Sequence, residues 1–180
     1  MAEKTLTPPK AAANGTPAGF GKTFPTRHDL PADKRAELIA LLNQQLADTK
    51  DLQTQTKHAH WNVKGENFIA LHKLFDELNA VLEGFVDEIA ERATALGGVA
   101  VGTARNVAAR TRLPELGLDT FHWKQLVPAM ADRFAHLAKT TREAIDAADD
   151  LGDKDTADLF TEVSRGLDQS LYFLEAHLQG

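Results

Sequence analysis

Two pairs of residues with metal-binding side chains lie within one stretch of the sequence that has helical periodicity. His72 and Asp76 are four positions apart, and so are Asp87 and Glu91. At about 100° per residue, all four side chains fall within about 100° of one another, on a different side from the apolar seam. Imidazole and carboxylate groups are suitable ligands for iron. Either pair alone is typical of a surface ion pair or a solvated face, so a metal site requires that the two pairs be combined.

The separation of the two pairs is too large for a single site within one chain. His72 and Asp87 are 15 positions apart, or about 22 Å along a helix, whereas the ions of a two-metal site lie about 4 Å apart. A second, antiparallel copy related by a two-fold axis near residues 81–82 would bring the pairs of two chains together. Ala80 and Gly84 would allow the two helices to approach closely. The spacing therefore predicts a metal site between subunits, with a dimer as its smallest unit.

The helix expected before this one carries a further candidate ligand. It begins at Pro31 and runs to about His60 or Trp61. Its second half, TKDLQTQTKHAH, has only Leu52 and Ala59 as apolar residues and is too polar for an ordinary core helix. We therefore expect this half to line a wet cavity, an interface or a site, with His60 as a possible ligand at its end.

The remaining pattern predicts three more long helices and no strands. The second helix covers about 66–96 and ends at a Gly-Gly pair, and a long connector at 97–120 contains a short helix at about 103–109. Two further helices, the first with Pro128 in its first turns, are joined by a turn at 151–155. The seam of the second helix consists of Phe68, Leu71, Phe75, Leu78, Leu82, Phe85, Ile89, Ala93 and Leu96. Short, long and short connections predict an all-α, ferritin-like four-helix bundle with one long crossover connection.

Residues 1–30 differ from the rest of the chain and are expected to form a flexible basic tail, ahead of a bundle at 31–180. Prolines and glycines interrupt any helix there. The segment through residue 28 carries +3, and the remainder of the chain carries −9, within a total of −6. Bulk charge therefore excludes general nucleic-acid binding, and any attraction for phosphate would come from the tail. Its cationic residues are Lys4, Lys10, Lys22 and Arg27.

Several classes of protein are excluded by what the sequence lacks. The chain has no cysteine, which excludes disulfide scaffolds, zinc ribbons and thiol catalysis. No apolar run approaches a membrane span and no secretory signal pattern is visible, so a cytoplasmic protein is expected. No Glu is followed by His three positions later, so a di-iron centre within one subunit is not expected. Neither a phosphate-binding glycine motif nor a G-x-S-x-G motif occurs.

Three stretches resemble one known family, the Dps proteins, or DNA-binding proteins from starved cells. They are KHAHWNVKGENFIALHKLFDEL, VDEIAERATALGGVAVGT and DTADLFTEVSRGLDQSLYFLEAHL, and the resemblance covers residues 30–180. It implies a ferritin-like bundle that assembles as a hollow homododecamer. It also implies oxidation of Fe(II), preferably by hydrogen peroxide, with storage of ferric mineral and, in many members, DNA binding.

The resemblance also assigns roles to individual residues. It implies a di-iron ferroxidase centre with His60, His72 and Asp76 from one subunit and Asp87 and Glu91 from its partner. Trp61 matches the tryptophan beside this centre, where it can intercept stray oxidising equivalents, although packing at a helix end would also explain it. His58 departs from the glutamine often found there, and we interpret it as a bystander because it points to another face of the helix than His60 does.

An acidic run occurs where the family forms negatively charged three-fold pores for iron entry. A solvated turn followed by a helix cap is the alternative explanation, and Lys154 interrupts the run. Its members are Asp149, Asp150, Asp153, Asp155 and Asp158. For the whole protein, a peroxide-consuming ferroxidase and iron store is the leading hypothesis. A nucleoid protein that binds DNA through its tails and a shell with a vestigial site are the alternatives.

Overall fold

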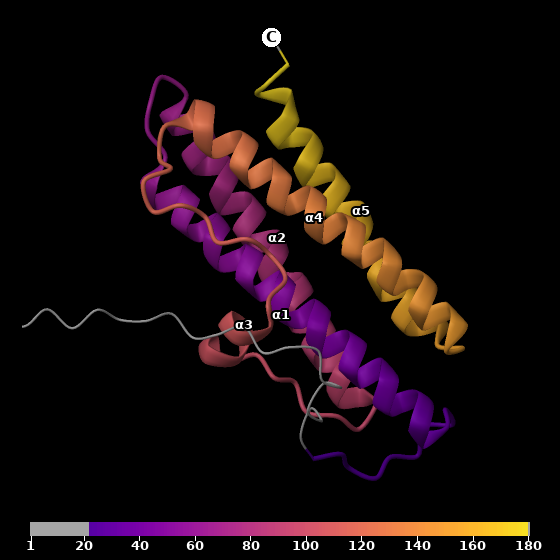
Figure 1. The fold of residues 1–180 in the computed structure, drawn as a ribbon. Helices are drawn as coiled ribbons and strands as arrows, with labels where there is room; N and C mark the ends of the chain where they lie inside the picture. The colour runs from indigo at the N-terminus through magenta and orange to yellow at the C-terminus, as the bar shows by residue number, and fades with distance from the viewer. Residues whose placement is uncertain (1–21, 180) are drawn as a thin grey trace, which may run out of the picture.

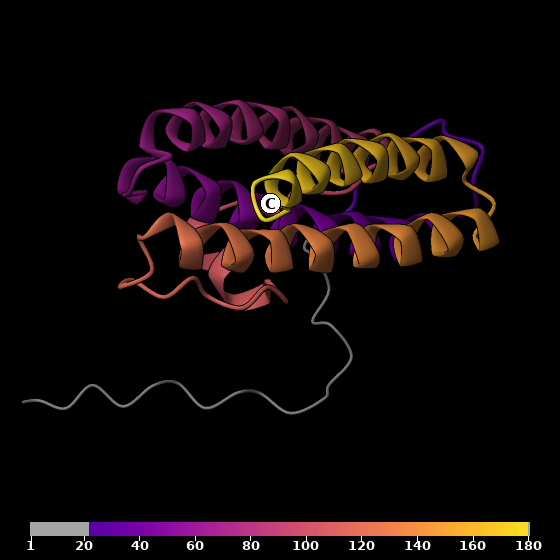
Figure 2. The same cartoon turned by 90° about the horizontal axis from the view of Figure 1, so that it is seen from above.

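The computed structural model describes residues 22–179, which form four long helices and one short helix (Figure 1). Their bounds are α1 (Ala32–Asn62), α2 (Phe68–Ala95), α3 (Ala104–Arg110), α4 (Trp123–Asp150) and α5 (Lys154–Ala176). α1 packs against α2 and α4 against α5, while α1 also contacts α4 and α2 contacts α5. Viewed from above, the four long helices run roughly along one direction (Figure 2). Because the connection between α2 and α4 spans the length of the bundle, the predicted four-helix bundle with one long crossover is confirmed.

The apolar seam predicted for the second long helix is buried in α2. Its buried residues recur every three or four positions and are Leu71, Phe75, Leu78, Leu82, Phe85, Ile89 and Ala93. Full burial of each large apolar side chain stabilises the fold by about 1.5–3 kcal/mol. Phe68, which the predicted seam included, is instead 40% exposed. It is the first residue of α2, and its ring contacts the ring of His72 rather than the core.

The turn between α1 and α2 is fixed by hydrogen bonds to the start of α4. The Lys64 amide donates to the carbonyl of Phe121 (2.9 Å), and the Trp123 amide donates to the carbonyl of Lys64 (3.0 Å). Gly65 adopts a φ of 115°, which a glycine adopts readily. α2 therefore begins at Phe68, two residues later than expected, because the residues before it form this turn.

The other helix ends lie close to the expected positions. α3 confirms the short helix in the connector, shifted by one residue. Pro31 is the N-cap residue of α1, just outside the helix. Pro128 lies in the second turn of α4, slightly deeper than expected, so one main-chain hydrogen bond is lost near the helix start. Within residues 22–179, no helix combines the length and the apolar character that a membrane span requires.

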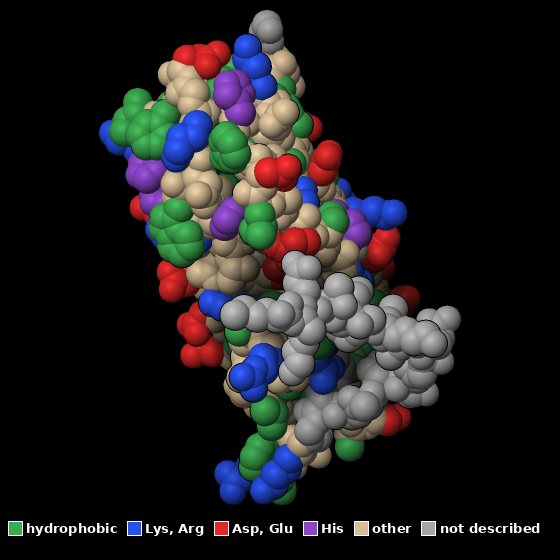
Figure 3. All heavy atoms as spheres, turned by 60° about the vertical axis from the view of Figure 1, so that its left-hand side comes forward, with side chains coloured by type: hydrophobic (Ala, Val, Ile, Leu, Met, Phe, Trp, Pro, Cys, Tyr) green, Lys and Arg blue, Asp and Glu red, His purple; other side chains and the backbone are tan. Residues whose placement is uncertain are grey.

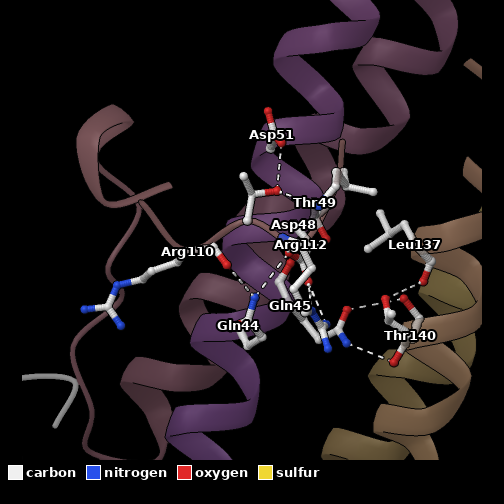
Figure 4. A network of polar contacts seen from close by, with 12 residues as sticks. Gln44, Gln45, Asp48, Thr49, Asp51, Arg110, Arg112, Leu137 and Thr140 are labelled. Carbon is white, nitrogen blue, oxygen red and sulfur yellow. Dashed lines mark hydrogen bonds and ion pairs between the residues drawn. The ribbon is translucent and has the colours of Figure 1, made fainter. Parts of the chain in front are cut away.

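Polar side chains of α1, both within the polar stretch 49–60 and just before it, are buried, and the crossover connection and α4 supply partners for them (Figure 4). The Asp48 carboxylate, which is fully buried, accepts hydrogen bonds from the Arg112 amide (2.7 Å), Nε (2.8 Å) and Nη2 (2.6 Å). Gln45 Nε2 donates to the carbonyl of Thr140 on α4 (2.9 Å). Buried polar groups are stable when they are paired in this way. The polarity of this helix thus partly serves to hold the crossover, which the sequence pattern alone did not indicate.

The described part of the N-terminal segment lies against the bundle. The Phe24 amide donates to the carbonyl of Gly97, at the end of α2 (2.8 Å). Gly97 has a φ of 88°, and a Cβ atom there would lie 2.7 Å from the Phe24 carbonyl oxygen. The chain therefore contacts the bundle at Phe24, ahead of the predicted boundary at residue 30. Lys22 and Arg27 are exposed, whereas Lys4 and Lys10 lie outside the described residues.

Candidate metal site

His60 and His72 face each other where the end of α1 meets the start of α2. Their rings are stacked, with centroids 3.9 Å apart and an interplanar angle of 21°. His60 Nδ1 lies 2.7 Å from the carbonyl oxygen of His72, and His72 Nδ1 lies 2.9 Å from that of His60. A carbonyl oxygen only accepts, so both Nδ1 atoms carry hydrogen. In the neutral rings, each Nε2 then has a free lone pair, which is the arrangement that metal-binding histidines require.

Asp76 adds a carboxylate next to this histidine pair. Its Oδ1 lies 3.9 Å from His60 Nδ1 and forms an ion pair with Lys57 Nζ. The hydrogen bond from Lys57 holds the pKa of Asp76 below its ordinary value, against a smaller opposing effect of burial. The carboxylate is therefore ionised at neutral pH. Its side chain is 53% exposed, so a ligand or a second chain can reach it.

Asp87 and Glu91 lie further along α2 and do not join this group. Both are exposed, and Asp87 lies 15 positions after His72 along the helix. Among residues 22–179, no three His, Asp or Glu side chains of one chain gather closely enough to hold a metal ion. The structure thus places His60, His72 and Asp76 next to one another without completing a metal-binding group, and it leaves Asp87 and Glu91 apart. The ligand set remains a prediction that requires a second copy of the chain.

The two pairs of predicted ligands on α2, His72 with Asp76 and Asp87 with Glu91, lie symmetrically about one level of the helix. The midpoint between His72 and Glu91 and the midpoint between Asp76 and Asp87 both fall between residues 81 and 82. Near that level Ala80 and Gly84 are exposed on the same side as the candidate ligands, and an added Cβ at Gly84 would meet no atom within 4 Å. A second α2 helix can therefore approach this side, which is the geometry that a two-fold axis at this level needs.

The half of α2 that carries Asp87 and Glu91 is strongly acidic. Burial raises the pKa of Glu88, and the negative charges of Glu162 and Asp87 raise it further. Glu91 also borders an open hollow, together with Glu88 and Arg92. The negative charges around Glu88 repel one another, so a cation near this half would be stabilised.

Trp61 lies at the end of α1 and is 64% exposed. It lines a pocket of about 420 Å³ together with His58, Glu115 and residues of α3. His58 therefore lies on the pocket side of α1, away from the stacked pair. Asn62 Nδ2 donates to the His58 carbonyl (2.9 Å). Figure 3 shows histidine, acidic and large hydrophobic side chains exposed together in the upper half of one face. The proposed role of Trp61 remains a prediction.

One member of the acidic run between α4 and α5 has a structural role. Asp153 is only 4% exposed and caps α5, accepting a hydrogen bond from the Thr156 amide. Arg92 Nη2 donates to both of its carboxylate oxygens (2.7 and 2.9 Å). Burial alone would raise the pKa of Asp153, but the hydrogen bonds from Arg92 and Thr156 and the charge of Arg92 outweigh it and lower the pKa. For Asp153, the alternative explanation given for the acidic run, a helix cap, therefore fits the structure.

The other members of the acidic run are exposed, and their assignment to a pore stays a prediction. They are Asp149, Asp150, Asp155 and Asp158. Lys154 pairs with Asp149. The sequence reasoning did not single out Lys57 or Arg92, although each contacts a predicted site residue. The sequence does contain an indication for Lys57. It precedes His60 by three positions, and residues with this spacing are neighbours on the surface of a helix.

The amino-acid sequence is similar to a known domain family and to proteins that share one name. A model of the ferritin-like domain matches residues 39–180. A relative from Agrobacterium fabrum, named DNA protection during starvation protein, is 44% identical over 158 residues, which cover 88% of this chain and 98% of the relative. A protein of the same name from Brevibacillus brevis is 32% identical and covers 79% of this chain and 96% of its own length.

Solved structures agree with the sequence comparison. DpsC from Streptomyces coelicolor superposes with a TM-score of 0.85 at 30% identity, covering 92% of this chain and 97% of that one. A Vibrio cholerae Dps protein, described as a member of a broad superfamily of ferritin-like diiron-carboxylate proteins, gives 0.78 at 25% identity, covering 83% and 94%. Since the helix order, the crossover and these matches over most of the chain all agree, the chain belongs to the Dps family and has the ferritin-like fold.

Proposed function

We propose that this protein oxidises Fe(II) with hydrogen peroxide at sites shared between two subunits. The ferric product is stored as mineral inside a hollow homododecamer, and the consumption of iron and peroxide protects DNA. The observation that carries the proposal is the stacked pair of His60 and His72, whose Nε2 lone pairs are free beside the ionised Asp76. Relatives named for DNA protection during starvation are consistent with this role.

Iron is the substrate, and the side chains suit both of its oxidation states. Imidazole nitrogens help to hold Fe(II), and carboxylates hold the harder Fe(III). Two Fe(II) ions each give one electron to a single peroxide, whose O–O bond breaks. With two protons, two water molecules form beside two Fe(III) ions. A site that holds both ions avoids the one-electron reaction that releases hydroxyl radical.

A subunit-mixing experiment tests whether each site is shared. One variant, His72→Ala with Asp76→Ala, lacks the first half of the site, and the other, Asp87→Ala with Glu91→Ala, lacks the second half. Each alone is expected to oxidise Fe(II) with peroxide far more slowly than the wild type. After dissociation and random reassociation, half of the dimers contain one chain of each kind, and each of these has one intact site out of two. Activity is therefore expected to return to about one quarter of the wild-type level.

The mixing experiment has a clear contrary outcome. If each site were contained within one chain, the mixture would be no more active than the average of the two variants. A matched control is Glu143→Ala with Asp146→Ala, which removes two exposed carboxylates from α4. This control is expected to keep wild-type activity, because neither residue lies near the two halves of the proposed site.

A second candidate role, DNA binding, rests on the charge distribution. The chain through residue 28 carries +3 against −9 for the remainder, and Lys22 and Arg27 are exposed. One segment with this charge binds phosphate weakly, but several segments on one assembly gain avidity. We therefore propose weak, sequence-independent DNA binding at low salt, separate from iron oxidation.

A further inference from the structure

A lysine side chain forms an ion pair with the carboxylate of the candidate metal site. Lys57 Nζ contacts Asp76 Oδ1, and the Lys57 side chain, on α1 one turn before His60, is 33% exposed. We propose that Lys57 is a resident cation that replaces the metal ion in the metal-free assembly. Its ammonium group would hold the two halves of each shared site together until an incoming metal ion displaces it from Asp76. This inference rests on the shared site proposed above.

The charges of the two halves explain why such a cation is needed. A shared site brings Asp76 of one copy to Asp87 and Glu91 of the second copy, so three carboxylates meet. Nδ1 of each histidine is directed at a main-chain carbonyl oxygen, so neither Nδ1 is hydrogen-bonded to one of these carboxylates. Carboxylates within a few ångströms of one another repel strongly in a partly dry interface. Lys57 is the cation that the structure shows in contact with one of these carboxylates.

The proposal predicts opposite effects on assembly and on metal binding. Removal of the ammonium group leaves the carboxylates uncompensated without metal, so the metal-free interface is expected to weaken. The same removal frees Asp76 for a metal ion, so metal binding is expected to become tighter. A lysine that only supported local packing would weaken both properties or neither. The opposite signs therefore distinguish a replacement cation from a structural side chain.

The test compares Lys57→Met, which keeps the length of the side chain, with Lys57→Arg, which keeps the charge. The matched control is Lys139→Met, which removes an exposed lysine that pairs with Glu143 on α4. The midpoint of disassembly in guanidinium chloride is measured by light scattering in a chelator and again with Zn²⁺. The Zn²⁺ affinity is measured by titration calorimetry, since Zn²⁺ has no redox chemistry. For Lys57→Met we expect a lower midpoint in chelator, recovery with Zn²⁺, and a Kd for Zn²⁺ roughly threefold to tenfold lower.

Two results would overturn the inference. One is a metal-free midpoint for Lys57→Met equal to that of Lys139→Met, and the other is Zn²⁺ binding that becomes weaker instead of tighter. If Lys57→Met lost helicity by circular dichroism, Lys57→Gln would carry the same comparison. A different result would show that the shared site itself does not form. In that case the Asp87→Ala, Glu91→Ala variant would bind Zn²⁺ with the same affinity as the wild type.

Discussion

Replacement of Arg92 by alanine is expected to destabilise the chain strongly through Asp153. Arg92 is 16% exposed and donates to both oxygens of a carboxylate that is 4% exposed. Loss of one partner of such a pair leaves a buried charge and typically costs about 3–5 kcal/mol. Thr156 still donates to Asp153, so the low end of this range, about 3 kcal/mol, is expected. For a chain of this size that corresponds to a fall in Tm of about 6–12 °C.

The assay is unfolding by heat and by urea, followed by circular dichroism. Arg142→Ala is the matched control, because Arg142 pairs with Asp168 at 2.9 Å but both side chains are more than half exposed. Exposed pairs contribute only about 0.2–1 kcal/mol. The double variant Arg92→Ala, Asp153→Asn is expected to recover part of the loss, since it no longer buries an unpaired charge. If Arg92→Ala lost no more stability than Arg142→Ala, the ion pair would not be a major support of the turn between α4 and α5.

The pH dependence of the same variant gives an independent check. The pKa of Asp153 lies below its ordinary value of 3.8 in the folded chain. Such a carboxyl group stabilises the fold above its unfolded pKa, and this stabilisation is lost as the pH falls through the folded pKa. The stability difference between the wild type and Arg92→Ala should therefore be full at neutral pH and shrink as the pH falls toward and below 3.8. A difference that stayed constant down to pH 2 would contradict the assigned cause.

Three further predictions concern assembly, DNA and the N-terminal segment. At neutral pH, light scattering should give a mass of about 235 kDa, twelve times the 19.6 kDa of one chain, and a mass near one subunit would refute the closed assembly. Deletion of residues 1–28 should abolish the low-salt gel shift of DNA but leave Fe(II) oxidation intact, whereas an unchanged shift would exclude the tail as the DNA-binding part. Gly97→Ala should lower the free energy of unfolding by about 1–2 kcal/mol, because φ is 88° and the new Cβ meets the Phe24 carbonyl. Denaturation in urea measures this loss, and no change would show that the contact with Phe24 is not required.

Periodicity predicted the helices well because their buried faces are set by local spacing. The seam of α2 and the long crossover follow from apolar residues every three or four positions and from connection lengths. The error at Phe68 arose because periodicity does not show where a helix leaves the core. The two histidines were predicted as ligands, but their mutual hydrogen bonds involve main-chain carbonyls that no side-chain pattern reveals.

Long-range polar pairing was harder to predict from the sequence. The polar second half of α1 indicated a cavity, an interface or a site, but no pattern indicated that Asp48, just before it, binds Arg112, 64 positions away. Arg92 and Asp153 are 61 positions apart and come together only where α2 meets the turn after α4. Such pairs leave no periodic signal, because either residue alone is typical of a solvated surface.

The hydrogen bonds between His60 and His72 have a consequence for engineering the site. The acceptor for each ring is a main-chain carbonyl, which every amino acid provides. A substitution at position 72 therefore keeps the main-chain carbonyl that accepts from His60. A substitution at position 60 likewise keeps the carbonyl that accepts from His72. One imidazole can be exchanged for a carboxylate or a thiol while the other keeps its tautomer, so variants with new metal preferences can be built one ligand at a time.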